Sequence, residues 1–152
     1  MIRLADAEAI AAIHNHGNEE RSVTFETRPQ RPEVVSDQIA HWKLVLVSEA
    51  DGEINGFARA GSCYHYYDGI AEATVFVERS ARGRGIGREL LAALIEGASE
   101  RGLHKLTARV FAGNEAGLAL FSSCGFRTVG RHERHGELEG EWLDVVLVER
   151  SL

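Results

Sequence analysis

A glycine-rich turn joins two apolar segments near the middle of this chain. The turn reads RGRGIG over residues 82–87, and it follows the strand-like segment IAEATVFVE at 70–78. The segment RELLAALIEGA begins directly after it, with leucines at helical spacing. This order predicts a strand, a tight turn and a long helix, with the unpaired N–H groups of the first helical turn beside three glycines.

Two interpretations of the turn stay open on spacing alone. In one, Gly83, Gly85 and Gly87 leave room for a phosphate at the helix N-terminus, and Arg82 and Arg84 add positive charge. In the other, the glycines only supply backbone freedom and the arginines face solvent. No Lys-Ser/Thr pair follows, which excludes a P-loop, and G-x-G-x-G differs from the dinucleotide fingerprint G-x-G-x-x-G.

Size, charge and residue spacing narrow the class of protein. The chain has 152 residues, 44% hydrophobic and 26% charged, which suits one domain over 1–152. Its net charge of −6 argues against nucleic acid as a partner. Without a membrane-length apolar run or a signal peptide, we expect a cytoplasmic protein that does not bind membranes. The seven histidines show no metal-ligand spacing, so we expect no metal.

Periodicity predicts strands and helices that alternate in the second half of the chain, which indicates an α/β or α+β fold. A helix is expected after a cap at Asp6, and the charged segment RHERHGELEGE at 131–141 is expected to be a solvated turn. The remaining expected elements are strands at 1–5, 43–50, 54–61, 70–78, 103–111, 125–132 and 141–150, and helices at 33–42, 84–101 and 114–124.

The strand IAEATVFV places one carboxylate within an apolar segment. Its period of two puts Glu72, Thr74 and Phe76 on one face and aliphatic side chains on the other. Since burying an unpaired carboxylate is costly, Glu72 either reaches water at an exposed strand edge or takes part in chemistry. In the second case it can act as a general base for an amine, which is protonated at neutral pH.

Several segments together resemble the GCN5-related N-acetyltransferases (GNAT). RGRGIG is similar to the family motif [RQ]-x-x-G-x-[GA], and NEAGLALFSSCGF at 114–126 to its N-x-x-x-x-x-L-[YF]-x-x-x-G-F segment. IRLADAEAIAAIHN at 2–15 is similar to the family's first strand and helix. The resemblance implies the GNAT fold, a central mixed, mostly antiparallel sheet of about seven strands flanked by about four helices.

Three further segments resemble one branch of that family, the phosphinothricin N-acetyltransferases. They are ERSVTFETRPQRPE at 20–33, IAEATVFV at 70–77 and HGELEGEWLDVVLVER at 135–150. The branch includes enzymes for arsinothricin and for methionine sulfone or sulfoximine. The resemblance implies transfer from acetyl-CoA to the amine of a small amino acid or analogue, a homodimer and a role in resistance. Acetylation of a protein N-terminus or polyamine, and a CoA-binding module without catalysis, remain alternatives.

The resemblance also assigns roles to residues. Glu72 is the expected general base for direct attack of the amine on the thioester. The expected contacts to acetyl-CoA are Arg82, Gly83, Arg84, Gly85, Ile86 and Gly87 at the pyrophosphate, Val75 and Val77 at the pantetheine arm, and Asn114 and Phe121. The expected substrate contacts are Phe25, Thr74, Arg59 and His135. The strand of Glu72 is expected to splay from the strand at 103–111 and leave a slot for the cofactor.

The family's proton donor is missing from this chain. Phe121 stands where the family has a tyrosine or histidine, and it cannot protonate the departing thiolate, so water is the expected donor. An acetyl-enzyme at Cys63 or Cys124 is an alternative, but neither has an activating neighbour in the sequence.

Four other candidates have a structural interpretation beside the functional one. Asn114 is a typical helix cap, and Phe25 can be an ordinary core residue. The segment GSCYHYYDG at 61–69 holds no arginine for a substrate acid group. Arg59 and Arg109 can compensate for that, or they can be solvated strand residues.

Overall fold

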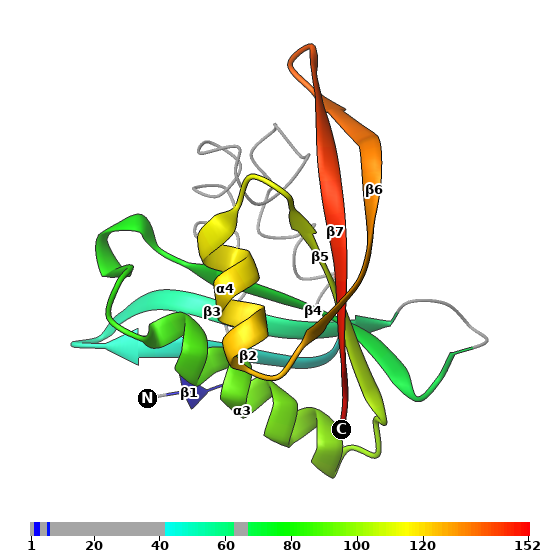
Figure 1. Cartoon of the computed structure of the whole chain (residues 1–152). Helices are drawn as coiled ribbons and strands as arrows, with labels where there is room; N and C mark the ends of the chain where they lie inside the picture. Colours follow the sequence, from blue (N-terminus) through cyan, green and yellow to red (C-terminus); the bar gives the residue numbers. More distant parts are fainter. Residues whose placement is uncertain (1, 4–5, 7–41, 63–66) are drawn as a thin grey trace.

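Seven strands form one sheet in the computed structural model of the chain, which describes residues 2–3, 6, 42–62 and 67–152 (Figure 1). The strand order is β1-β2-β3-β4-β5-β7-β6. The elements are β1 Ile2–Arg3, β2 Trp42–Ala50, β3 Glu53–Ser62, β4 Ile70–Val77, a 3-10 helix Arg79–Ala81, α3 Ile86–Glu100, β5 Lys105–Phe111, α4 Glu115–Ser123, β6 Arg127–Leu138 and β7 Glu141–Ser151. The helix expected after Asp6, and residues 33–41 of the next one, lie outside the described part.

The pairing of β4 with β5 is the one parallel contact among these strands, so the mixed, mostly antiparallel sheet is confirmed. The two strands pair only from Ile70 opposite Lys105 to Glu72 opposite Thr107. Beyond that point β4 continues along β3 and β5 continues along β7, and the two strands diverge (Figure 1). The expected splay is therefore confirmed, and it begins at Glu72.

The helices α3 and α4 pack on one face of the sheet. Leu90, Leu91 and Leu94 of α3 are fully buried there, at the spacing of an amphipathic helix. Burying each leucine contributes about 1.5–3 kcal/mol, so this stripe fixes α3 against the sheet. On the opposite face, Phe76 of β4 stacks on Phe57 of β3 with ring centroids 6.1 Å apart. The predicted alternation of β4 is confirmed.

Two expected helix boundaries were wrong. The helix after the glycine turn begins at Ile86 rather than Arg84, because Gly85 has a φ of 84° and cannot be helical. Trp42, expected at the end of a helix, is the first residue of β2 and pairs with Gly61 of β3. That pairing partner lies far away in the sequence, so the local pattern does not reveal it.

The expected solvated turn over 131–141 was right about exposure but too long. The strand β6 continues to Leu138, and only Glu139 and Gly140 connect it to β7. Nearly all side chains of β6 are exposed, because the β6–β7 hairpin extends beyond the body of the sheet (Figure 1). Backbone pairing with β7 holds this strand, so its side chains need no apolar alternation.

Candidate active site

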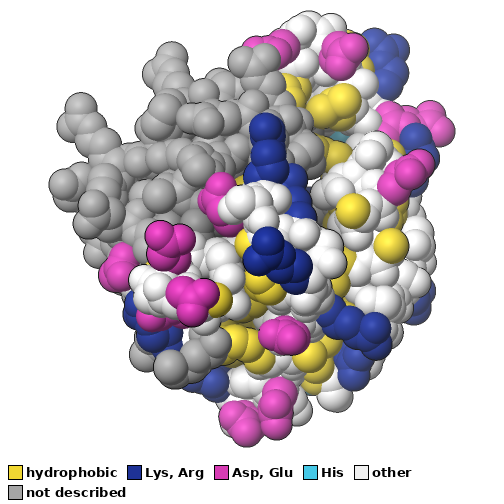
Figure 2. Space-filling view, turned by 90° about the vertical axis from the view of Figure 1, so that its left-hand side faces the viewer, with side chains coloured by type: hydrophobic (Ala, Val, Ile, Leu, Met, Phe, Trp, Pro, Cys, Tyr) yellow, Lys and Arg dark blue, Asp and Glu magenta, His cyan; other side chains and the backbone are white. Residues whose placement is uncertain are grey.

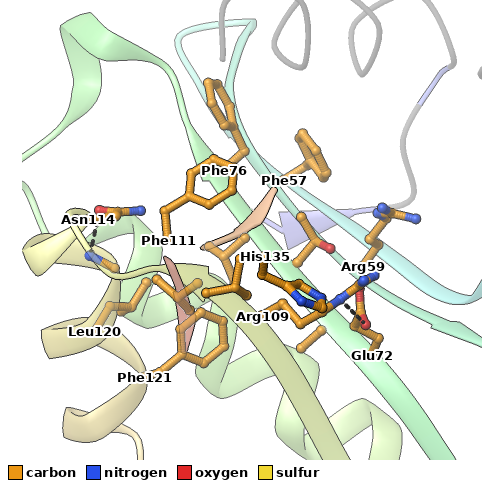
Figure 3. Close-up of a pocket in the computed structure, with 16 residues that line it drawn as sticks. Phe57, Arg59, Glu72, Phe76, Arg109, Phe111, Asn114, Leu120, Phe121 and His135 are labelled. Carbon is orange, nitrogen blue, oxygen red and sulfur yellow. Dashed lines mark hydrogen bonds and ion pairs between the residues drawn. The ribbon is translucent and has the colours of Figure 1, made fainter. Parts of the chain in front are cut away.

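Two adjoining cavities connect the glycine turn with the slot between β4 and β5. The first, here the turn cavity, has a volume of about 290 Å³ and lies at Gly83, Gly85 and Gly87. The second, here the central cavity, has a volume of about 260 Å³ and lies between β4, β5 and α4 (Figure 3). Both are lined by Val75, Phe76, Gly117 and Leu120.

A third cavity adjoins the central cavity at the start of the splay. This arginine cavity, of about 340 Å³, includes Gly61, Ser62 and Thr107 in its lining. It shares four residues with the central cavity, namely Arg59, Glu72, Thr74 and Arg109. The three cavities therefore follow one another along β4, with Glu72 at the junction of the last two.

The backbone of the turn leaves space for an anion. Gly83 and Gly85 have φ values of 78° and 84°, which L side chains rarely adopt. A Cβ atom at either position would meet no atom within 4 Å, so the space in front of the turn is open. The first intrahelical bond runs from the Glu89 N–H to the Gly85 carbonyl, which leaves the preceding N–H groups of α3 without an intrahelical acceptor. This geometry fits a pyrophosphate.

The arginines at the turn differ in their surroundings, and the expected contacts of Arg82 and Arg84 to acetyl-CoA stay predictions. Arg82 Nε donates to the Val77 carbonyl at 3.0 Å, and its guanidinium lies 5.6 Å from the Phe76 ring centroid. Arg82 and Arg88 line the turn cavity, whereas Arg84 is exposed and is not among its lining residues. Sequence reasoning missed Arg88, although its place in the first turn of the helix was visible.

Glu72 forms a bidentate ion pair with Arg109 (Figure 3). Arg109 Nε donates to Oε2 and Nη2 donates to Oε1, each at 3.0 Å. The register explains the contact: Glu72 stands opposite Thr107, and Arg109 is two residues further along β5 on the same face. The side chains are 32% and 60% exposed, and ion pairs this exposed contribute about 0.2–1 kcal/mol. Both carboxylate oxygens of Glu72 therefore accept hydrogen bonds from Arg109, but the ion pair is weak.

Arg59 is the second cation at this junction. It stands opposite Thr74 in the β3–β4 ladder, half-buried, with its guanidinium 4.5 Å from the Trp42 ring centroid. Burial lowers the pKa of Arg59; the carboxylate of Glu72 counteracts this and Arg109 adds to it. No hydrogen-bond acceptor contacts this guanidinium in the part of the chain that the structure describes. Arg59 is thus an incompletely neutralised cation that lines both cavities.

A bulge in β6 carries His135 into the central cavity. Pairing shifts from His132 opposite Val145 to Gly136 opposite Leu143, so three residues of β6 face Asp144 alone. His135 lies in this bulge and lines the central cavity beside Arg109 (Figure 3). It stacks on His132 with ring centroids 4.3 Å apart.

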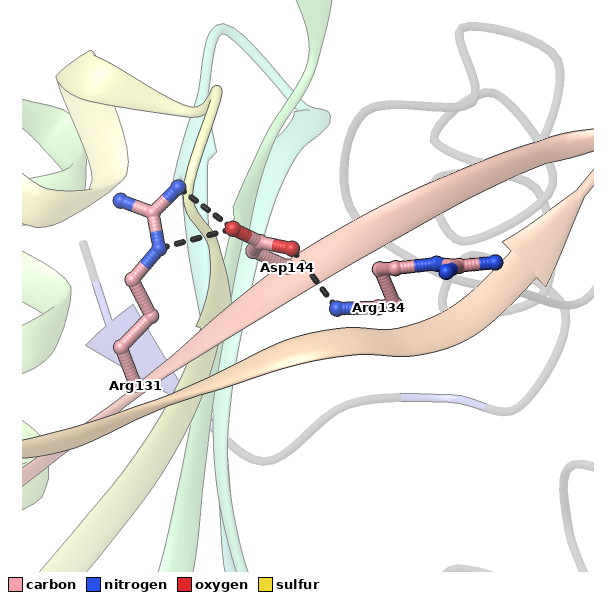
Figure 4. Close-up of polar contacts among 3 residues, drawn as sticks. All are labelled: Arg131, Arg134 and Asp144. Carbon is pink, nitrogen blue, oxygen red and sulfur yellow. Dashed lines mark hydrogen bonds and ion pairs between the residues drawn. The ribbon is translucent and has the colours of Figure 1, made fainter.

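Asp144 holds the bulge in place (Figure 4). Its Oδ1 accepts the backbone N–H of Arg134 at 2.8 Å, and its Oδ2 accepts Nε and Nη2 of Arg131 at 2.8 and 2.6 Å. Arg134 has a φ of 47°, so this contact supports a backbone conformation that is rare outside glycine. The Arg134 N–H first, and then the Arg131 guanidinium, lower the pKa of Asp144.

The helix α4 forms another wall of the central cavity. Asn114 caps it, with Oδ1 accepting the Gly117 N–H at 3.0 Å, so the capping interpretation is confirmed. Phe121 is 6% exposed and packs edge-on against Phe126 with centroids 4.9 Å apart. Both residues line the cavity, and a contact to acetyl-CoA stays a prediction for each.

The remaining predicted site residues lie partly in the cavities and partly outside the described residues. Phe25 and Cys63 lie outside the described residues. Thr74 lines the central and arginine cavities, and Val75 and Val77 line the turn cavity. The sequence did not identify Phe57 and Phe111 as residues of the central cavity, because an aromatic residue in a strand is first expected to be a buried core residue.

The described residues offer neither a metal site nor a membrane-spanning helix. They contain no group of three His, Cys, Asp or Glu side chains that could hold a metal ion. No helix among them is long and apolar enough to cross a membrane. Acidic and basic side chains are interspersed on the face seen in Figure 2.

The fold and the cavities suit an acetyltransferase, and comparison with known proteins shows that the chain is one. Residues 1–147 match the family model described as an acetyltransferase (GNAT) domain. The chain therefore belongs to the GNAT family, whose acetyltransferases use acetyl-CoA.

Two curated relatives are amino-acid acetyltransferases by name. One is the L-methionine sulfoximine/L-methionine sulfone acetyltransferase of Pseudomonas aeruginosa, 31% identical over 98% of this chain and 91% of that protein. The other is the phosphinothricin N-acetyltransferase of Streptomyces coelicolor, 32% identical over 97% of this chain and 91% of that protein. The similarity of the chain to the phosphinothricin branch is therefore confirmed.

Solved structures show the same fold. The ribosomal-protein-alanine N-acetyltransferase of Brucella melitensis has a TM-score of 0.94 and 34% identity, covering 100% of this chain and 99% of that one. A Salmonella typhimurium protein solved with acetyl-CoA has a TM-score of 0.91 and 29% identity, covering 100% of this chain and 93% of that one.

Proposed function

We propose that the chain acetylates the primary amine of a small amino acid or amino-acid analogue, with Glu72 as general base. The observation that carries this proposal is the position of Glu72, which lines both the central cavity and the arginine cavity. An amine held at this junction lies beside the carboxylate and faces the cavity that continues to the glycine turn. Such positioning beside a base supplies both orientation and proton transfer.

The residues along the turn and central cavities fit acetyl-CoA, which supplies the activated acetyl group. The N–H groups at the start of α3, with Arg82 and Arg88, are suited to the pyrophosphate. Val75 and Val77 stand along the slot between β4 and β5, where the pantetheine arm fits. Asn114 and Phe121 line the central cavity, where the thioester would lie.

The reaction is a direct transfer between two bound substrates. The neutral amine nitrogen attacks the carbonyl carbon of the thioester, the new C–N bond forms and the C–S bond breaks. Before the attack, Glu72 takes a proton from the ammonium form of the amine, directly or through water, and the second proton that the nitrogen loses as the amide forms passes to water. The thiolate takes a proton from water, since Phe121 has none to give and a thiol pKa of about 8.5 makes thiolate a tolerable leaving group.

The substrate side of the junction favours an amine that also carries an acid group. Arg59 lacks a hydrogen-bond acceptor within the described part and lines both cavities, which suits a carboxylate or phosphinate. Thr74 and His135 lie at the same junction and can contact the rest of the substrate. The names of the Pseudomonas and Streptomyces relatives support this substrate class.

Incubation of the purified protein with acetyl-CoA and an amine panel tests the proposal. The panel contains phosphinothricin, arsinothricin, methionine sulfone and methionine sulfoximine, and thiol release is followed. We expect release above background with at least one of them, and its loss in Glu72→Gln. No release with any member of the panel would overturn the proposal.

A protein N-terminus is a second candidate substrate, favoured by the name of the Brucella structure. A dipeptide or spermidine that outcompetes the amino-acid analogues would support that reading. A CoA-binding module without catalysis would bind acetyl-CoA in calorimetry, and Glu72→Gln would leave any residual activity unchanged. A homodimer, a cytoplasmic location, a resistance role and one domain over 1–152 stay predictions.

A further inference from the structure

We propose that Arg109 exchanges Glu72 for the acid group of the incoming substrate, so that the substrate itself frees the base. This inference rests on the proposed function. In the structure, Arg109 engages both oxygens of Glu72 at 3.0 Å, which leaves the carboxylate occupied on the side where it would meet an amine. An amine can reach the oxygen lone pairs that the guanidinium now occupies only after Arg109 has moved.

The two arginines differ in how they are held, and the difference assigns the exchange to Arg109. Arg59 is half-buried and stacked on Trp42 at 4.5 Å, so it is a fixed cation. The Arg109 side chain is 60% exposed and reaches the junction from β5, on the far side of the splay. Because an exposed ion pair is weak, a second anion can compete with Glu72 for this guanidinium.

The arginine cavity has the charge that such an anion requires. Among its described lining residues, two arginines and Glu72 are charged, which leaves a net charge of +1. Ser62, Thr74 and Thr107 line the same cavity, so hydroxyl donors are present in addition to the guanidinium groups. A single carboxylate or phosphinate would neutralise the net charge of these residues.

The arrangement defines the chemical class of the substrate as an amine with an acid group on the same or a neighbouring carbon. When the acid group binds Arg59 and Arg109, a short linkage leaves the amine beside the released Glu72. A carboxamide or ester of the same amino acid is neutral at that position and leaves the ion pair intact. Recognition of the acid group and release of the base are therefore one event.

Steady-state kinetics of Arg109→Gln with an accepted amino acid and its carboxamide test the exchange. We expect kcat/KM for the acid to fall about ten- to hundredfold, because a charge-assisted contact is lost. We expect kcat for the carboxamide to rise, because Glu72 is no longer paired. Equal losses for both substrates, or a fall for the acid without a rise for the carboxamide, would overturn the exchange.

Two matched variants separate this role from a structural one. Arg109→Lys keeps the charge but loses the bidentate fork, so it should recover part of the preference for the acid. Arg127→Gln removes another cross-strand arginine–glutamate pair, to Glu149, outside the three cavities, and should leave the preference unchanged. A preference altered equally in Arg127→Gln would contradict the proposal.

A binding measurement keeps this inference distinct from the proposed function. The chain has two tryptophans, so Trp142→Phe leaves Trp42, stacked on Arg59, as the sole tryptophan. In that background, titration with the amino acid should change Trp42 fluorescence, and Arg109→Gln should weaken binding at least about tenfold. If no amine is acetylated, the proposed function is wrong, but this titration still tests whether Arg109 binds the acid group. Unchanged binding in Arg109→Gln would overturn the proposed exchange.

Discussion

Glu72 stands opposite Thr107 in the last pair of the parallel ladder between β4 and β5. Beyond this pair the strands separate, and the central cavity opens between them (Figure 3). The carboxylate therefore lies where the sheet stops being continuous, and a strand residue gains access to a cavity without leaving the sheet.

Replacement of Glu72 tests its role as the base. Glu72→Gln keeps the size of the side chain but cannot accept the amine proton, so kcat should fall by about 10²–10⁴. Acetyl-CoA binding by calorimetry should remain, because the turn cavity lies at the other end of the path. A kcat within a few-fold of the unchanged protein would contradict the assignment.

The glycine turn can be tested with a pair of alanine substitutions. Gly85→Ala forces a residue with a Cβ to adopt a φ of 84°, which should cost about 1–2 kcal/mol in the free energy of unfolding and raise KM for acetyl-CoA. Gly52→Ala is the matched control, since Gly52 has a φ of 79° in the β2–β3 turn and open space around it.

Gly52→Ala should lose similar stability with an unchanged KM for acetyl-CoA. Urea unfolding and initial-rate kinetics measure the two effects. An equal rise of KM in both variants would mean that the effect comes from backbone strain rather than from the turn itself.

Asn114 separates capping from cofactor binding. Asn114→Ala should lose about 0.5–2 kcal/mol of stability, because the Gly117 N–H loses its acceptor. Asn114→Asp keeps an acceptor and should restore that stability. If Asn114 also contacts acetyl-CoA, KM for acetyl-CoA should stay raised in Asn114→Asp; recovery of both properties would leave only the capping role.

Asp144 predicts a dependence of stability on pH. Its pKa is lowered in the folded state, chiefly by the Arg134 N–H, so its ionised form stabilises the fold above the ordinary aspartate pKa of about 3.9. That contribution is lost as the pH falls through the lower, folded-state pKa. Asp144→Asn should therefore be less stable than the unchanged protein at neutral pH, with the difference closing in acid.

Urea unfolding at a series of pH values measures this difference. The same variant should raise KM for the amine, because the bulge that carries His135 loses its support (Figure 4). A difference in stability that persists unchanged in strong acid would exclude the carboxylate as its source.

Much of the fold could be predicted because its signals are local. The period of two in β4 and the leucine spacing of α3 report which side of each element is buried, and both were confirmed. Only the first part of β6 was predicted, as a strand at 125–132; the rest carried no such signal, because both of its faces are exposed and backbone bonds to β7 hold it. The bulge at His135 could not be predicted either, because it depends on how β6 pairs with β7 and leaves no pattern of buried side chains.

Residues that are neighbours along the chain are enough to indicate the family, the glycine turn and the carboxylate of Glu72 within an apolar strand. The surroundings of that carboxylate depend instead on how distant strands pair. The parallel register of β4 and β5 sets Arg109 against Glu72, and the antiparallel register of β3 sets Arg59 beside Thr74. The glycine turn is a local feature, so it predicts the acetyl donor from the sequence. Register depends on pairing between distant segments, so the two arginines form a candidate acid-binding site only in the folded sheet.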